Sequence, residues 1–377
     1  MPLDLDLARN QLFSLPELYK SNFSIIDHKI RNTLNASDLL GIKQVIIVGN
    51  GDSYFAGMAS VQTFQRYTSC IYKVVQSMRF FAYEHAFIKE YSPGQTLILG
   101  ISASGESKRV VQALQEGRKS VPGSKIFVIC GNPDSSVARV ADKVIDVSIP
   151  DKGTAPGIRS YTASLFGLLG IALRLGELQG KIHLHEANAV RSSIPLLAPH
   201  VEKVINNSLQ LIEKIKALPL RNVFTVVGSG NNYGTALFSA AKFVEIAGLN
   251  ATSQDLEEWL HVERFAYPLD STVLVVAPMG KSFIHAKKMI KVAKTIGHHI
   301  ICLTDNPDDR FITETVDVCI PIYEVYDELF SNLLMYIPSI PFAIAYAERL
   351  ERMMFMSDNV EIKDSRQALS KRLKEEM

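Results

Sequence analysis

The sequence contains one pattern of strands and loops twice, about 175 residues apart, and this duplication limits the possible folds more than any other feature. An apolar run and a glycine-containing loop occupy 45–54, and a similar run and loop occupy 223–233. Two further strand-like runs follow in each copy, and the last leads into Asn-Pro-Asp, at 132–134 and again at 306–308. A repeat of this length indicates a duplicated domain and not a stack of short units.

Each copy predicts a doubly wound α/β domain. The strand-like runs are short, continuous and rich in Val and Ile, as is typical of a parallel sheet with helices on both faces. We expect strands at 45–48, 96–101, 126–130, 223–227, 272–277 and 300–304, and helices at 56–66, 108–120, 235–247 and 284–296. The fold class is therefore α/β, with two tandem, doubly wound, flavodoxin-like parallel-sheet domains.

The repeat also predicts how the chain is organised. We expect a helical N-terminal segment, a first domain, a second domain and a C-terminal tail, at 1–35, 36–195, 196–350 and 351–377. In sheets of this kind, ligands bind beyond the carboxyl ends of the strands, where loops lead into helix N-termini. Both glycine loops and the serine-rich loop after the strand at 96–101 fall there.

Composition and charge narrow the class of partner. A hydrophobic fraction of 47% over 377 residues suffices for two cores of ordinary size. The formal charge of +1 gives no reason to expect nucleic acid or an acidic membrane as a partner. Residues 1–4 do not begin a secretory signal, and we expect no membrane span of ~20 apolar residues. We expect a cytoplasmic protein, in which the apolar run at 333–347 is a buried helix.

The sequence predicts neither a metal nor a cofactor. A single histidine among the glutamates at 257–263 is typical of a solvated helix face, so no metal is assigned. Neither glycine loop completes G-x-G-x-x-G, because Tyr54 and Tyr233 stand where the third glycine belongs. The Gly-Lys-Ser at 280–282 lacks the first glycine of a P-loop. The four cysteines have no metal-ligand spacing and are expected to be reduced thiols: Cys70, Cys130, Cys302 and Cys319.

The strongest chemical signal is the loop Ser102–Ser107, which reads Ser-Ala-Ser-Gly-Glu-Ser between a strand and a helix. Its hydroxyls and free backbone N–H groups surround one point, where the helix dipole favours an anion. Gly105 allows the backbone to approach that anion closely. The alternative is that Ser102 or Ser104 only caps the helix. Three hydroxyls at the end of a buried strand favour phosphate binding.

Two motifs resemble those of the sugar isomerase (SIS) domain family. Ser102–Ser107 matches its Ser-x-Ser-Gly-Glu-Thr/Ser signature, and 51–54 matches its Gly-Thr-Ser-Tyr loop, with Asp52 in place of threonine. The similarity extends over about 40–371, to the isomerase half of glucosamine-6-phosphate synthase. The resemblance implies a sugar 6-phosphate ligand, and it implies that the phosphate is held by Ser53, Ser102, the backbone of Ala103, Ser104 and Ser107.

A second constellation suits proton transfer. Lys242 and Glu245 lie three residues apart on an expected helix and so share a face. Aldose–ketose isomerisation needs a carboxylate that moves a proton between C1 and C2, and an acid/base that opens the ring. The resemblance assigns these roles to Glu245 and His261, and Glu258 matches a further family position. The alternative interpretation is that Lys242 and Glu245 form a surface ion pair and that His261 is an ordinary packed histidine.

The sequence departs from the family at several sugar-contacting positions. Ser160 matches a serine of the family, but Ala155 and Thr162 replace its glutamate and lysine. Arg159 is new and can meet a carboxylate or another anion bidentately. Lys371 lies in a stretch similar to the one that holds the family's Schiff-base lysine, but this stretch is one residue longer. The plain alternative for Lys371 is a solvated helix end.

These departures favour enzymes that break a C–N bond. The first candidate is a deaminase or isomerase of an amino-sugar phosphate, and the second is a deglycase that splits a 6-phosphorylated Amadori adduct into a sugar phosphate and an amino acid. A simple aldose–ketose isomerase and a non-catalytic sugar-phosphate sensor are the alternatives. Because Pro2 follows Met1, without the nucleophilic cysteine of the synthase's glutaminase half, we expect no use of glutamine.

The resemblance also implies a homodimer with shared active sites, in which the histidine reaches the neighbouring subunit's site. Apolar residues around His261 supply either interface anchors or ordinary core packing. These residues are Leu256, Trp259, Leu260 and Phe265.

Overall fold

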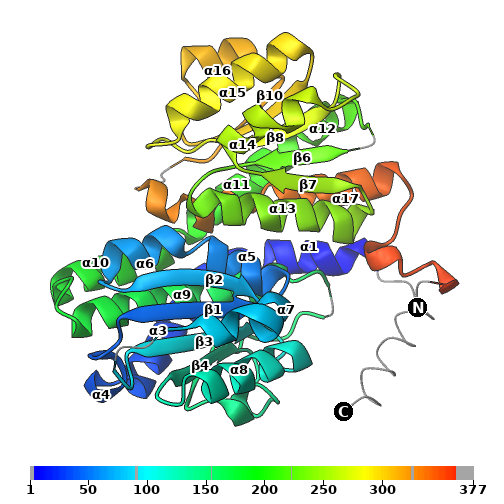
Figure 1. The fold of residues 1–377 in the computed structure, drawn as a ribbon. Coiled ribbons are helices and arrows are strands. Elements are labelled where there is room, and N and C mark those ends of the chain that lie inside the picture. Colours follow the sequence, from blue (N-terminus) through cyan, green and yellow to red (C-terminus); the bar gives the residue numbers. More distant parts are fainter. Residues whose placement is uncertain (1–3, 90–91, 154, 222, 324–326, 362–377) are drawn as a thin grey trace.

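The computed structural model describes residues 4–89, 92–153, 155–221, 223–323 and 327–361, and it contains two parallel five-stranded sheets (Figure 1). The first sheet has the order β2-β1-β3-β4-β5 and the second β10-β9-β8-β6-β7. Read from its other edge, the second order is the first one repeated, which confirms the tandem doubly wound α/β fold. The strands are β1 (Gln44–Gly49), β2 (Ile71–Gln76), β3 (Thr96–Ser102), β4 (Lys125–Cys130), β5 (Lys143–Asp146), β6 (Phe224–Val227), β7 (Ala251–Gln254), β8 (Thr272–Val276), β9 (His299–Thr304) and β10 (Val318–Pro321).

Helices surround both sheets. The expected helix at 108–120 is confirmed as α8, and those at 235–247 and 284–296 are found with slightly earlier starts as α13 and α15. The helices longer than five residues are α1 (Leu5–Phe13), α3 (Phe23–Thr33), α5 (Asp52–Met58), α6 (Val61–Tyr67), α8 (Lys108–Ser120), α9 (Ile158–Leu178), α10 (Leu184–Leu196), α11 (Ala198–Gln210), α12 (Ile212–Ala217), α13 (Asn231–Ala247), α14 (Leu256–His261), α15 (Phe283–Ile296), α16 (Arg310–Thr315) and α17 (Ser339–Arg349).

The prediction of one continuous helix at 56–66 is wrong, because α5 ends at Met58 and α6 begins at Val61. The second domain packs directly on the backbone at this break. A Cβ atom on Gly234 of α13 would lie 2.2 Å from the Ala59 nitrogen. The Asn332 amide also donates to the Ala59 carbonyl at 2.7 Å. The helix is therefore interrupted at a point where the two domains are in contact. Local helix propensity cannot reveal such a contact.

The prediction of a buried helix at 333–347 is correct only in its second part. Helix α17 begins at Ser339, with Pro338 as its N-cap and Pro341 in its first turn. Proline is tolerated in the first turn of a helix but not in its interior, so the helix cannot extend back through both prolines. The preceding residues, Glu328–Leu333, form a short 3₁₀ segment.

Helix α9 is mostly buried and packs against α3, α5 and α6. By length and composition alone, its 21 residues could cross a membrane. The sequence-based expectation that no stretch approaches the length of a membrane span is therefore wrong for this helix. However, 83% of its most apolar window is buried inside the protein, as in the core helix of a soluble protein.

The two domains meet along α5, α6 and α13, and α1 lies between the two sheets (Figure 1). The Gln62 backbone N–H donates to the Asn231 side chain at 2.9 Å, across the domain boundary. Helix α1 packs against both α9 and α17. The N-terminal segment therefore belongs to the core of the assembled chain, and it contributes a residue to the cavity described below.

Candidate active site

The serine loop follows β3, the middle strand of the first sheet, and leads into α8. Ser102 is buried at the strand end, and Ser104 is exposed beyond it. Ser107 is the N-cap of α8 but makes no side-chain capping hydrogen bond. Within the described part of the chain, the Ser104 hydroxyl accepts only a local hydrogen bond, from the Glu106 N–H at 3.2 Å. The capping alternative therefore does not account for Ser102 or Ser107, and the first-turn N–H groups of α8 suit a bound anion.

Gly105 fixes the shape of this loop. Its φ of +76° lies in the left-handed region, and a Cβ atom there would meet the Ser135 Oγ at 2.1 Å. Only glycine satisfies both conditions. Glu106 turns away from the loop and accepts hydrogen bonds from the Ser136 hydroxyl and N–H. These bonds lower the pKa of Glu106, so its charge is held outside the anion cradle.

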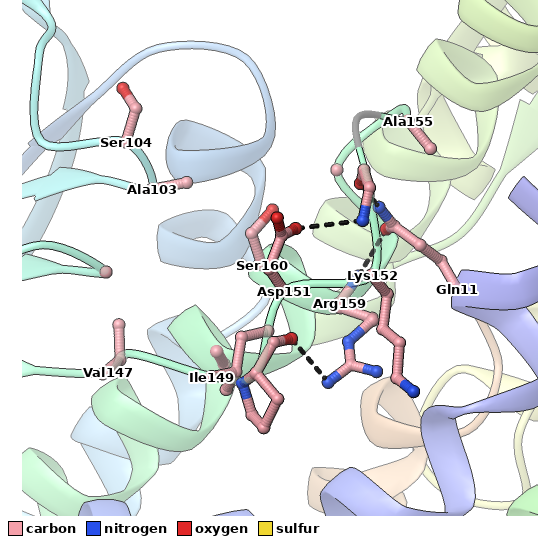
Figure 2. A pocket seen from close by; sticks show the side chains of 15 residues that line it. Gln11, Ala103, Ser104, Val147, Ile149, Asp151, Lys152, Ala155, Arg159 and Ser160 are labelled. Carbon is pink, nitrogen blue, oxygen red and sulfur yellow. Dashed lines mark hydrogen bonds between the residues drawn. The ribbon is translucent and has the colours of Figure 1, made fainter. Parts of the chain in front are cut away.

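A cavity of about 330 Å³ opens beside the serine loop. Figure 2 shows Ser104 on one side of this cavity, with Arg159 and Gln11 on the other. Among the described residues, the lining consists of Gln11, Ala103, Ser104, Gly131, Val147, Ile149, Pro150, Asp151, Lys152, Gly153, Ala155, Gly157, Arg159, Ser160 and Ala163. The cavity thus joins the expected phosphate contacts Ala103 and Ser104 to the expected sugar contacts Arg159 and Ser160.

Asp52 lies beside Gly157 of the cavity wall and contacts the second domain. It begins α5, next to the buried Ser53, and a Cβ atom on Gly157 would lie 2.5 Å from Asp52 Oδ2 and 2.9 Å from Ser160 Oγ. The same Oδ2 accepts a hydrogen bond from Lys242 Nζ at 2.8 Å. Lys242 also donates to Glu245 Oε2 at 2.5 Å. The structure therefore links Asp52 of the first domain to Glu245 of the second through Lys242, although none of the three side chains lines the cavity.

Lys242 is not part of a surface ion pair, which was the plain alternative for this motif. Its side chain is 0% exposed, and its Nζ lies 4.6 Å from the centre of the Phe238 ring. Burial by itself lowers the pKa of Lys242, but the carboxylates of Asp52 and Glu245 outweigh burial and raise it. The side chain is therefore a buried cation between two anions.

His261 and Glu258 lie elsewhere. Both are exposed on α14, and His261 Nε2 lies 3.2 Å from Glu257 Oε1. Neither lines the cavity. Leu256 and Trp259 are 2% and 1% exposed in the second core, so for these two residues the alternative of core packing is correct and that of interface anchors is wrong. Lys371 lies outside the described residues.

In the second domain, the loop that corresponds to the serine loop binds a side chain of the protein itself. β8 holds the position of β3, and the loop after it binds the chain's own carboxylate. The Lys281 N–H and the Ser282 hydroxyl each donate to Glu328, both at 2.9 Å. The Met279 N–H donates to Asp305 at 2.6 Å. The loop donors that face a cavity in the first domain are therefore satisfied internally in the second.

Sequence reasoning missed several cavity residues. Gln11 comes from α1, and its amide donates to the Gly153 carbonyl at 2.9 Å, which no local pattern predicts. Gly131 could have been found, because it precedes the first Asn-Pro-Asp where Asp305 precedes the second. Among the described residues, no group of three or more His, Cys, Asp or Glu side chains could hold a metal ion.

Known proteins show the same architecture. Residues 38–173 match the model of the SIS domain. The chain is 26% identical over 331 residues to the glutamine–fructose-6-phosphate aminotransferase (isomerizing) of Thermococcus kodakarensis, a match that covers 86% of this chain and 53% of that relative. The chain therefore spans about half the length of this curated relative.

Solved structures share the fold at low sequence identity. The C-terminal domain of glucosamine-fructose-6-phosphate aminotransferase from Francisella tularensis matches with a TM-score of 0.75 and 16% identity, over 93% of this chain and 97% of that one. Glucosamine-6-phosphate deaminase from Thermotoga maritima matches with a TM-score of 0.65 and 16% identity, over 90% and 95%. Residues 38–173 of the first domain thus match the SIS domain model, and the second domain repeats the strand order of the first.

Proposed function

We propose that the protein is a cytoplasmic enzyme, active without a cofactor, that isomerises an amino-substituted sugar 6-phosphate and breaks its C–N bond. The observation that carries this proposal is the link from Asp52, which precedes the expected phosphate contact Ser53, through Lys242 to Glu245, because this link fixes the position of a potential base. A pure sensor has no need of a carboxylate held by a buried cation.

Glu245 is the proposed base. It takes a proton from C1 or C2 of the open-chain sugar and returns it to the other carbon, which turns the amine into an imine. Water then hydrolyses the imine to a carbonyl group and a free amine, so that one water is consumed for each C–N bond broken. A 2-amino aldose gives a ketose and ammonia by this route. A 1-amino ketose gives an aldose and the amine that it carried.

The sequence similarity to a glutamine–fructose-6-phosphate aminotransferase, and the fold shared with a glucosamine-6-phosphate deaminase, support a sugar 6-phosphate that carries or exchanges an amino group. The deciding experiment incubates the purified protein with hexosamine 6-phosphates and with 6-phosphorylated fructose–amino acid adducts. Ammonia identifies a deaminase, and free amino acid identifies a deglycase. Interconversion of the sugars without a free amine identifies a simple isomerase, and tight binding without any product identifies a sensor.

We expect the double variant Ser102→Ala, Ser104→Ala to lose phosphate affinity before it loses stability. Each charge-assisted hydrogen bond to a bound anion is worth about 1.5–3 kcal/mol, so each lost bond raises KM by about 10- to 150-fold. Steady-state kinetics give KM, and thermal unfolding checks the fold. Ser136→Ala is the control, because this hydroxyl donates to Glu106 and not into the cradle. Unchanged affinity in the double variant would disprove the phosphate site.

The active unit is proposed to be a homodimer in which His261 serves the neighbouring subunit's site. Within one chain His261 is exposed and does not line the cavity, and Val262, Phe265 and Tyr267 beside it are exposed apolar side chains. Exposed aromatic residues of this kind are enriched in interfaces.

Mixed dimers test this sharing. We expect Glu245→Gln and His261→Ala chains to be nearly inactive separately. In a 1:1 mixture after subunit exchange, half of the dimers are hybrids, and each hybrid has one intact site of its two, so about a quarter of the wild-type activity returns if a two-fold dimer shares its sites. No recovery in confirmed hybrids, or full activity of a monomer in sedimentation assays, would contradict shared sites.

A further inference from the structure

Arg159 is a buried cation, and only some of its hydrogen-bond donors have partners within the described protein. It lies in the first turn of α9 and is 5% exposed, yet it lines the cavity. Its Nη1 donates to the Ser14 hydroxyl at 2.6 Å and its Nη2 to the Pro150 carbonyl at 3.2 Å. Its Nε is buried and has no hydrogen-bond partner among the described residues. The Nε–Nη2 edge, with which arginine can hold a carboxylate bidentately, therefore carries one hydrogen bond and one unused donor.

The charge of this guanidinium is also incompletely balanced. Both of its hydrogen-bond acceptors are neutral oxygens, whereas the buried Arg191 is hydrogen-bonded to Asp27 and Glu177. Burial lowers the pKa of Arg159, and Asp151 opposes this effect only through its charge at a distance. A buried charge that is not fully compensated favours an anionic partner. The described protein residues supply no such hydrogen-bonded partner to Arg159.

The position of Arg159 relates it to the substrate. Figure 2 shows Ser104 on the opposite side of the cavity from Arg159, with the loop around Lys152 beside the arginine. The helix dipole and hydroxyls at the serine loop favour a phosphate at one side. A ligand whose phosphate lies there would extend its other end towards Arg159.

We propose that Arg159 binds a carboxylate at the end of the substrate opposite to its phosphate. The proposal rests on the proposed function, and it narrows the substrate class to sugar 6-phosphates whose nitrogen belongs to an amino acid. A free amino sugar has no group for Arg159. Lys152, also on the cavity wall, adds a second positive charge near the same carboxylate.

The competing explanation is that Arg159 only ties α9 to α1 through Ser14. This explanation predicts that a substitution weakens all ligands alike. Binding must therefore be compared between two ligands that differ in one group: a 6-phosphorylated fructose–amino acid adduct and the same adduct with its carboxylate converted to a carboxamide. Calorimetry on the Glu245→Gln background measures both affinities without turnover, so the result does not depend on whether the enzyme cleaves either ligand.

We expect the carboxylate adduct to bind about 10- to 150-fold more tightly than the carboxamide, as a charge-assisted hydrogen bond implies. Arg159→Gln should remove most of this ratio, and Arg159→Lys should restore part of it because the charge remains without the fork. Arg139→Gln, on the surface, is the control. A folding defect weakens the binding of both adducts equally, so it leaves the ratio of the two affinities unchanged.

Three results would overturn the proposal: equal binding of the two adducts, an equal loss of both in Arg159→Gln, or preferential Arg159-dependent binding of fructose 1,6-bisphosphate, which would assign the site to a second phosphate. Failure of the proposed function is a different result. In that case the wild-type protein binds the carboxylate adduct with the expected preference but releases no amine from it.

Discussion

The variant Glu245→Gln is expected to lose about 10²- to 10⁴-fold in kcat while KM changes little, because glutamine keeps the size of the side chain but cannot accept a proton from carbon. Lys242 can still donate to the glutamine oxygen, so the buried lysine keeps a partner there. The measurement is steady-state kinetics on whichever substrate of the panel is cleaved. Direct binding to the variant establishes that the substrate still enters the site.

A matched control is available in the same domain. Glu213 accepts from Lys216, also three residues away, at 3.2 Å, but its side chain is 85% exposed. Glu213→Gln removes a carboxylate from a similar local pair on the surface and should leave kcat unchanged. Full activity in Glu245→Gln, or an equal loss in Glu213→Gln, would refute the role of Glu245 as the base.

His261 has a different expected signature. If it opens the sugar ring, His261→Ala should slow the reaction of a cyclic substrate more than that of an open-chain analogue, which needs no ring opening. A folding defect slows both equally. Equal losses on the two substrate types would therefore refute this division of labour.

Six strands and the loops after them could be predicted because their signals are local, whereas β2, β5, β7 and β10 were not predicted. Continuous Val- and Ile-rich runs lead into Gly or Ser loops, and the repeat confirms each strand independently in the other copy. The break at Ala59 and the core positions of Leu256 and Trp259 could not be predicted, since both depend on what packs against them. An apolar stripe has the same sequence pattern whether it faces a core or a partner.

The sequence could predict which residues belong to the candidate site, but not which of them contact one another. The sequence identified Asp52 and Lys242 separately, but they are 190 residues apart, and no periodicity predicts that one is the other's counter-ion. The substitution of Asp52 for the family's threonine has a physical reason only once the buried ammonium group is seen beside it. Similarly, only the structure reveals that Glu328 fills the second domain's loop.

The largest expected effect on stability comes from Lys242→Met. Methionine fills much of the lysine's volume, but it leaves Asp52 without the cation that compensates it, and Asp52 Oδ1 already has no hydrogen-bond partner among the described residues. Removing one partner of a buried ion pair costs about 3–5 kcal/mol in the free energy of unfolding. Glu245, whose side chain is 30% exposed, should lose less because water can reach it.

Urea unfolding of a double-mutant cycle tests this account. Adding Asp52→Asn to Lys242→Met removes the uncompensated charge, so the double variant should be more stable than Lys242→Met alone. In the wild type, the raised pKa of Lys242 means that its contribution is fully present below its unfolded-state pKa and is lost only as the pH rises through the folded-state value. The gap between wild type and Lys242→Met should therefore be constant from neutral pH to about pH 9 and close only in strongly alkaline solution. Two outcomes would contradict this account. One is a loss below about 1 kcal/mol in the free energy of unfolding of Lys242→Met, as for an exposed ion pair. The other is a strictly additive loss in the double variant, which would mean that Lys242 and Asp52 do not interact.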